Sequence, residues 1–474
     1  MIKFNSDKFV GLLLIFLCGI FILIGLLTSG TFDSGDSTYH YLHAKYALKY
    51  PSILLDHWAK PLFTLISVPF ASVGFNGMKI MNTIICISSA WFIYLSAKKL
   101  EIRNAILIPI ILFSAPVFFL VQYSGLTEPL FALFLTIGLY FCLVKKPFIA
   151  AIFISFLPFV RTEGQIVMII YAFYFIFSKQ WKGILFLSVG NIFYGIVGLI
   201  AKNDFFFTFH ENAYAKGSDN YGSGGLFHFV YQLSFQIGFP LFVLFCIGLI
   251  YFIFTIFQIK KLAETPYYLE KIFLVLGVYA AYFISHSIFW WQGWFHSFGL
   301  SRVLLAIYPL GSVIILIGFN FLVYEIFVKK TQIQKIVYSL LLIVVAIFPF
   351  LGTKASFKFS KNFSLSNDQI LLNDVAFWYK NSGIDASHIY YSHQYLAIPM
   401  GIDPFDKNLA SGGYLRNNDS IIHNSIIVWD QFFSVIEDDT PEDTIKNLKD
   451  VELIKTFTTG EKEKPYQIKV YYKK

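Results

Sequence analysis

Long apolar runs separated by short polar segments dominate the 474-residue chain. Read as helices, these runs predict a polytopic α-helical membrane protein, because crossing a hydrocarbon core of about 30 Å takes roughly 20 apolar residues. The eleven predicted spans are 9–27, 79–97, 105–121, 128–144, 147–160, 164–178, 183–200, 235–257, 272–290, 303–327 and 336–351. A further run at 62–75 contains proline, which favours a re-entrant or interfacial helix over a full span.

From about residue 352 the pattern becomes that of a small α/β domain. The segment "SNDQILLNDVAFWYKNSG" has apolar residues at helical spacing, and "HIYYS", "SIIVWD" and "YQIKVYY" are typical of strands. "TPEDTIKNL" predicts another helix, with Thr440 as N-cap and Pro441 in the first helical position. We therefore expect a transmembrane domain over 1–351 and an α/β domain over 352–474.

The basic residues orient the predicted spans. With the N-terminus in the cytoplasm, every inside loop is short and basic, as the positive-inside rule requires. These inside residues are Lys98, Lys99, Arg103, Lys145, Lys146, Lys179, Lys182, Lys260, Lys261, Lys271, Lys329, Lys330 and Lys335. The long loops 28–78 and 202–234 and the α/β domain then lie outside. All ten histidines fall on this outer side, either because polar chemistry faces outward or because the inside loops are simply short and filled with lysine.

Composition agrees with a membrane protein and excludes some other classes. Hydrophobic residues make up 56% of the chain and charged residues 14%, too few for the surface of a soluble domain. The net charge of +8 is spread among loops between apolar runs, so we expect no nucleic-acid partner. The cysteines lie inside apolar runs without metal-ligand spacing, and we expect no disulfides. The run 9–27 is too long for a typical signal sequence and predicts a retained first span.

The first outer loop concentrates polar residues in "TFDSGDSTYHYLHAKYALKYPSILLDHWAKP", residues 31–61. A helix is expected from just after Asp36 to Tyr50, with Asp36, His40 and His43 on one face. Such a face can supply a carboxylate base or bind a divalent cation. The alternative is the polar face of an interfacial helix.

Further candidates lie at the outer ends of later runs. Lys60 in "HWAKP" either extends to the membrane surface or holds a phosphate. Glu128 in "TEP" is either a first-turn residue of its helix or a functional carboxylate. Arg161 and Glu163 in "RTEG" are costly at membrane depth unless they are paired or used. Arg302 starts a span, at the helix end that disfavours a cation, which favours an anion ligand.

The second outer loop contains "HENAYAKGSDNYGSGG", which includes His210, Glu211, Lys216 and Asp219. The mixture of glycine and polar residues predicts a flexible flap over an outer cavity.

In their order, these motifs resemble the polyprenyl-phosphate-dependent glycosyltransferases of the GT-C fold, kin to protein O-mannosyltransferases and to the lipid A aminoarabinose transferase. The resemblance is carried best by residues 31–82, with "GDSTYHYLHAKYA" followed by "HWAKPLFTLISVPFASVGFNGMKIMN". It places the catalytic acid at Asp36 and the lysine of the "KP" element at Lys60. The chain departs from the family at Ser37, where an acidic residue is common, and at Ala59, where the aminoarabinose branch has glutamate.

The resemblance implies an enzyme of the bacterial cytoplasmic membrane, acting on its outer face. It would move a hexose or mannose-like sugar from a polyprenyl phosphate to an acceptor hydroxyl on a lipid, glycan or protein, with inversion. Asp36 would accept the hydroxyl proton, while Lys60, Arg161 and Arg302 stabilise the phosphate. Expected supporting residues are Asp33, His40, His57, Glu128 and Glu163. A divalent metal is an open possibility with Asp36, His40 and His43 as ligands, although nothing in the sequence requires one.

Two other classes of function compete with an enzyme. One is a transporter or flippase for a lipid-linked glycan, and the other is a non-catalytic assembly protein of the cell envelope. Transporters usually carry ionisable residues in mid-span and repeated, broken helices. Here the charges gather at the outer ends of the spans, which favours chemistry at the membrane surface.

Overall fold

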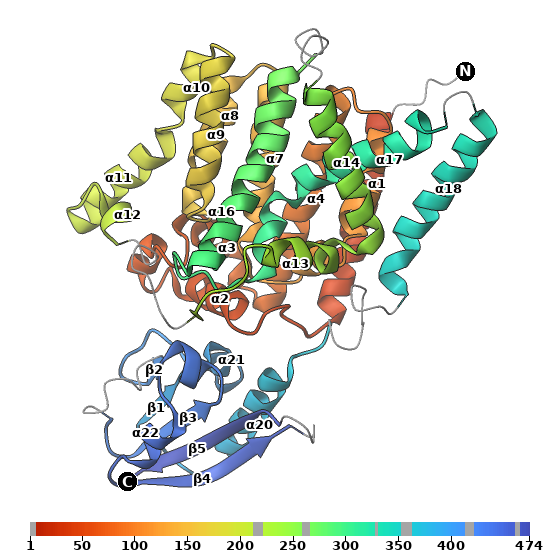
Figure 1. Ribbon diagram of the computed structural model, residues 1–474. Coiled ribbons are helices and arrows are strands. Elements are labelled where there is room, and N and C mark those ends of the chain that lie inside the picture. Colours follow the sequence, from red (N-terminus) through yellow and green to blue (C-terminus); the bar gives the residue numbers. More distant parts are fainter. Residues whose placement is uncertain are drawn as a thin grey trace.

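A helical bundle carries a separate α/β domain at one end, and the N-terminal helix starts near the opposite end (Figure 1). This computed structural model describes residues 6–211, 221–257, 266–327, 330–351, 363–412, 421–459 and 465–474. The predicted architecture of apolar helices followed by a small α/β domain is therefore confirmed.

The main helices of the bundle follow the predicted apolar runs. They are α1 (Ser6–Leu27), α4 (Phe75–Lys99), α7 (Glu128–Leu143), α8 (Pro147–Ser155), α9 (Gly164–Phe177), α10 (Trp181–Phe186), α11 (Val189–Lys202), α14 (Phe239–Phe257), α16 (Val278–Gln292), α17 (Tyr308–Asn320) and α18 (Thr331–Ile347). Helix α4 packs against α1 and α7, and α14 packs against α17. In the described residues, six helical stretches are long and apolar enough to cross a membrane. The count of eleven spans stays a prediction.

Several predicted runs are interrupted. The run 105–121 forms η2 (Ala105–Leu107), α5 (Ile108–Phe113) and α6 (Pro116–Val121). The chain bends before Pro116 because proline lacks the N–H group that would continue the helix. The π-helices η5 (Glu270–Gly277) and η7 (Phe321–Glu325) extend α16 and α17, and the short helix η6 (Ser301–Ile307) precedes α17.

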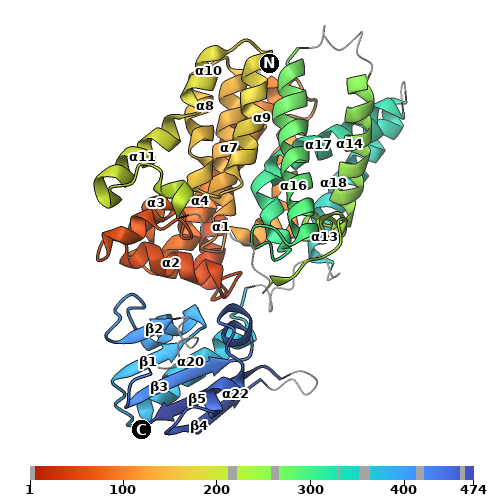
Figure 2. The ribbon, with the colours of Figure 1, turned by 60° about the vertical axis from the view of Figure 1, so that its left-hand side comes forward.

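The first outer loop lies at the end of the bundle that faces the α/β domain (Figure 2). It contains α2 (Asp36–Tyr46), η1 (Pro51–Leu55) and α3 (Pro61–Ala71). Helix α2 starts at Asp36, just before the predicted start, and ends at Tyr46 rather than Tyr50. Pro51 begins η1, because proline suits the first position of a helix. Helix α3 spans 11 residues, too short to cross a bilayer.

The α/β domain has one five-stranded sheet in the order β2-β1-β3-β5-β4. The strands are β1 (His388–Tyr391), β2 (Ala410–Gly412), β3 (Ser425–Asp430), β4 (Val451–Thr458) and β5 (Gln467–Lys473). Strand β1 pairs in parallel with β2 and β3, whereas β5 is antiparallel to β3 and β4. The long helix α20 (Asn367–Asn381) matches its predicted segment. The short helix α22 (Glu442–Lys446) starts with Pro441 as N-cap, one position later than predicted.

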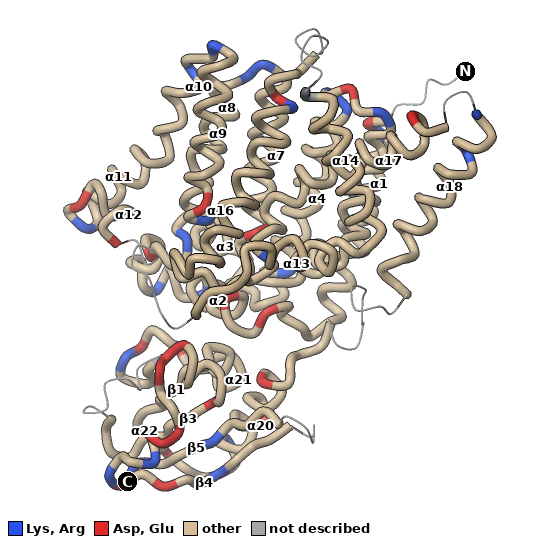
Figure 3. Tube along the Cα trace, viewed as in Figure 1, with Lys and Arg blue, Asp and Glu red and all other residues tan. Residues whose placement is uncertain are grey.

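Charges are distributed unevenly along the bundle (Figure 3). Lysine and arginine positions at the ends of α10 and α18 lie at the end of the bundle far from the α/β domain. At this end Lys98 pairs with Asp7 at 2.6 Å, and Lys145 pairs with Glu270 at 2.7 Å. The described loops that were predicted to be cytoplasmic therefore share one end of the molecule.

Candidate functional site

The start of α2 is fixed by hydrogen bonds to the segment before α7. The Asp33 carboxylate accepts a hydrogen bond from the backbone N–H of Ser37 at 3.1 Å, which satisfies one of the free N–H groups of a helix N-terminus. The Ser37 hydroxyl donates to the Thr31 carbonyl at 2.9 Å and accepts from the Gly125 N–H at 2.7 Å. Asp36, the first residue of α2, is therefore held against the end of the bundle that faces the α/β domain.

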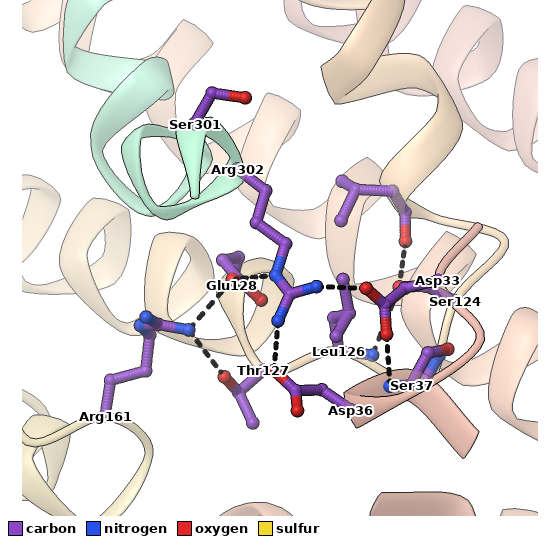
Figure 4. A network of polar contacts seen from close by, with 12 residues as sticks. Asp33, Asp36, Ser37, Ser124, Leu126, Thr127, Glu128, Arg161, Ser301 and Arg302 are labelled. Atoms are coloured by element: carbon purple, nitrogen blue, oxygen red, sulfur yellow. Dashed lines mark hydrogen bonds and ion pairs between the residues drawn. The ribbon is translucent and has the colours of Figure 1, made fainter. Parts of the chain in front are cut away.

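Arg302 stands at the centre of the site (Figure 4). Its guanidinium donates to the carboxylates of both Asp33 and Asp36, and its Nε lies 3.5 Å from Oε1 of Glu128. The side chain enters from η6, so the network joins the first outer loop, the start of α7 and the start of a later span. Arginine suits this position because its planar fork can serve several carboxylates at once.

Arg161 forms the second half of the network. Its guanidinium pairs with Glu128 at 2.9 Å and with Glu163 at 2.9 Å, and it donates to the Thr127 hydroxyl at 3.1 Å. Glu128, only 1% exposed, thus lies between two arginines. Glu128 is the first residue of α7 and its carboxylate also forms ion pairs, so the functional interpretation of "TEP" stays a prediction.

Lys60 contacts the segment that contains Arg161 and Glu163. It precedes α3 with a φ of +67°, and its ammonium donates to the Thr162 hydroxyl at 3.1 Å and to the His57 carbonyl at 3.2 Å. The residue is 6% exposed. Loss of hydration on burial lowers the pKa of Lys60 to about 7, while the nearby Glu163 acts in the opposite direction.

Asp36 is the carboxylate of this network that solvent reaches most easily, with 44% of its side-chain surface exposed. Protein nevertheless surrounds it closely enough for loss of hydration to raise its pKa, although the guanidinium of Arg302 acts in the opposite direction. A carboxylate with a raised pKa is a stronger base near neutral pH. The role of Asp36 as a base stays a prediction.

The side chains of His40 and His43 contact groups other than the carboxylates and arginines of this network. His40 stacks on Trp58 with ring centroids 5.0 Å apart, and Nδ1 of His43 lies 2.9 Å from the Tyr39 carbonyl oxygen. Asp36 instead contacts Arg302. Among the described residues, no group of three or more His, Cys, Asp or Glu side chains could hold a metal ion. The interpretation of Asp36, His40 and His43 as metal ligands thus finds no support in the arrangement.

The expected arginines contact all three expected supporting carboxylates, Asp33, Glu128 and Glu163. The structure also adds partners that the sequence analysis did not name. Thr127 and Thr162 belong to the motifs "TEP" and "RTEG". Their hydroxyl groups accept hydrogen bonds from Arg161 and Lys60, respectively. His286 lies in an apolar run, and its Nε2 is 3.5 Å from Glu163. A polar residue within an apolar helix was the available signal for it.

The predicted flap gives a mixed outcome. Its first part is ordered by local pairs, with Asp204 2.8 Å from His210 and Lys202 contacting Glu211. Lys216 and Asp219 lie outside the described residues. Within the described part of the loop, the side chains of His210 and Glu211 contact Asp204 and Lys202 and not the carboxylate–arginine network, so the flap stays a prediction.

Comparison with known proteins identifies the fold. No family model matches the chain, and neither does any curated protein. Among solved structures, ArnT from Cupriavidus metallidurans bound to undecaprenyl phosphate superposes with a TM-score of 0.60 at 10% identity, covering 97% of each chain. The apo state of the same protein gives 0.59 at 9% identity and 98% coverage of each chain. The chain therefore has, over almost its whole length, the GT-C fold of ArnT that the sequence resemblance predicted.

Proposed function

We propose that the protein is a membrane glycosyltransferase that takes a sugar from a polyprenyl phosphate and transfers it to an acceptor hydroxyl on the outer face of the cytoplasmic membrane. One observation supports the proposal most directly: Arg302, a cation suited to phosphate, contacts the partly exposed carboxylate of Asp36 and also Glu128, which pairs with a second such cation, Arg161. The fold supports it, since the ArnT structure of the same fold holds undecaprenyl phosphate.

The reaction needs one base and stabilisation of a leaving phosphate. The acceptor oxygen forms a bond to the anomeric carbon of the sugar, and the bond from that carbon to the phosphate oxygen breaks. The phosphate leaves with the electron pair, and the acceptor proton passes to a carboxylate oxygen of Asp36. A single displacement of this kind inverts the anomeric configuration. Phosphate is already a good leaving group, so cations suffice without a strong general acid.

Lys60, Arg161 and Arg302 are the proposed phosphate ligands. Both arginines are engaged with carboxylates, so a bound phosphate would exchange with at least one of those partners. The exchange at Arg302 would be the most useful one for catalysis. If a phosphate oxygen replaced Asp36 as the partner of the Arg302 guanidinium, the Asp36 carboxylate would be free to act as base. Arginine favours the exchange since it binds carboxylate and phosphate with the same geometry.

The resemblance suggests a hexose or mannose-like sugar and a lipid, glycan or protein as acceptor. A flippase or transporter for a lipid-linked glycan is the alternative, but transport does not need a carboxylate base beside phosphate-binding cations. The first expectation is therefore chemical turnover by the purified protein.

The decisive experiment replaces the proposed base. Asp36→Asn should lower sugar transfer from polyprenyl-phosphate sugars by about 10²- to 10⁴-fold, the usual contribution of a positioned base. Binding of undecaprenyl phosphate should remain, because the cations are intact. Asp374→Asn, which changes an exposed carboxylate on α20, is the matched control and should transfer normally. Normal transfer by the Asp36→Asn protein would exclude Asp36 as base.

A further inference from the structure

The α/β domain contacts the short loop that carries Asp33 and Asp36. The Gly30 N–H donates to the Phe363 carbonyl at 2.9 Å. The side-chain nitrogen of Gln369, near the start of α20, donates to the Thr31 hydroxyl at 2.8 Å. This second bond crosses between the two domains and is buried.

The Thr31 hydroxyl connects Gln369 to Asp33 through two hydrogen bonds. It accepts from Gln369 and donates to the Asp33 carbonyl oxygen at 2.8 Å. A hydroxyl has a single proton, so an N–H donor on one side directs that proton toward the acceptor on the other side. The Asp33 carboxylate in turn accepts from Arg302 and from the Ser37 N–H. A path of three hydrogen bonds thus connects Gln369 to Arg302, and another path of three connects it to the start of α2.

Gln369 is itself rigidly held. It is 1% exposed, and its side-chain oxygen accepts from the Ser366 backbone N–H at 3.2 Å. The two residues form a capping box at the start of α20. Its amide therefore has one orientation, with the oxygen toward Ser366 and the nitrogen toward Thr31.

We infer that Gln369 is a positioning residue of the α/β domain, which acts through Thr31 and Asp33 to set the placement of Arg302 and Asp36. The inference rests on the proposed function of that site. The α/β domain then completes the catalytic centre instead of serving as a separate module.

Two variants isolate this contact from the folding of α20. Gln369→Glu keeps an oxygen for the capping box, in which glutamate is equally suitable, but loses the N–H that faces Thr31. Thr31→Val removes the same contact from the other side without adding a charge. Each should lower kcat on the order of 10- to 100-fold, the scale of a displacement of about 1 Å. The KM for the donor should change less than kcat, since Lys60 and Arg161, two of the three proposed phosphate ligands, do not depend on this contact.

The combination of the two changes is the strictest test. Because both remove one contact, the double variant should be no slower than the slower single variant. Thermal midpoints should stay close to the wild-type value in Thr31→Val, and the Asp374→Asn control should keep its activity. Wild-type kcat in either single variant, or losses that multiply in the double variant, would overturn the inference while leaving the proposed function intact. A wild-type protein that transfers no sugar would instead refute the proposed function.

Discussion

At the scale of single residues, the site depends on burying several charges together. Glu128 is almost completely buried, and such a carboxylate is tolerated only when it is paired. Arg161 and Arg302 supply that pairing from two different parts of the chain. A lysine could not replace Arg302, because a single ammonium lacks the fork that reaches Asp33 and Asp36 at once.

Lys60 gives a prediction about pH. Its pKa lies near 7 in the free protein because burial removes hydration, so the ammonium is charged below pH 7 and loses its proton as the pH rises through that value. Binding of undecaprenyl phosphate should therefore weaken between about pH 6 and pH 8.5. Lys60→Arg should remove the part of this pH dependence that is due to Lys60, since arginine stays charged throughout the range.

Titration of affinity against pH in both proteins is the measurement. The lipid phosphate itself titrates near pH 6, but it does so equally with both proteins, and only their difference reports on Lys60. Identical slopes for the wild-type and Lys60→Arg proteins would place the titrating group elsewhere.

The sequence identified the charged residues of the site better than their partners. Asp36, Lys60, Arg161 and Arg302 were expected to act together, and ion pairs or hydrogen bonds place them in and around one network. The partners were not predictable, because Arg302 and Asp33 are 269 positions apart. Nor does any periodicity show that the Gln369 amide turns toward Thr31.

At the scale of elements, the structure determines two features that the local sequence pattern left open: what covers a helix face and where a helix ends. The face of α2 with His40 and His43 appeared suited to solvent or a metal, yet Trp58 from the following turn packs against both rings. The predicted span 105–121 read as one apolar run, but Pro116 divides it into shorter helices.

The docking of α2 gives a prediction about Gly125. A Cβ at this position would lie 2.3 Å from the Ser37 carbonyl oxygen, a distance that real atoms do not adopt. Gly125→Ala should therefore push the start of α2 away, misplace Asp36 and lower sugar transfer at least about tenfold. The thermal midpoint should fall as well, because the contact is buried and closely packed.

Gly19→Ala is the matched control, since a Cβ on this residue of α1 meets nothing within 4 Å. Alanine is the better helix former there by about 0.5–1 kcal/mol, so stability should stay equal or rise slightly. Full activity of the Gly125→Ala protein would show that Asp36 does not depend on this contact.

At the scale of the whole molecule, the hydrophobic pattern predicted the apolar helices and the α/β domain, whereas the expectation of a GT-C fold came from the resemblance of residues 31–82 to that family. Apolar runs specify helices that bury their faces against one another, and many sequences satisfy this requirement. The GT-C fold can thus be shared with ArnT at 10% identity, although no family model matches the chain. The arrangement of the helices around the site could not be derived in this way, because the apolar pattern contains no information on which helices are neighbours.

The two ends of the molecule give the last prediction. The basic loops lie at one end, and the α/β domain with the Asp36 network lies at the other (Figure 3). By the positive-inside rule we expect the basic end to face the cytoplasm and the site to face outward. A cysteine introduced at exposed Lys407 in the α/β domain should react with a membrane-impermeant maleimide in intact cells.

A cysteine introduced at exposed Lys182, in a predicted inside loop, should react only after the membrane is permeabilised. The unmodified protein serves as the control for its four native cysteines, which lie within helices. The opposite labelling pattern would place Asp36 on the cytoplasmic side. An outer-face transferase would then be excluded, because its base could not meet an acceptor on the outer surface.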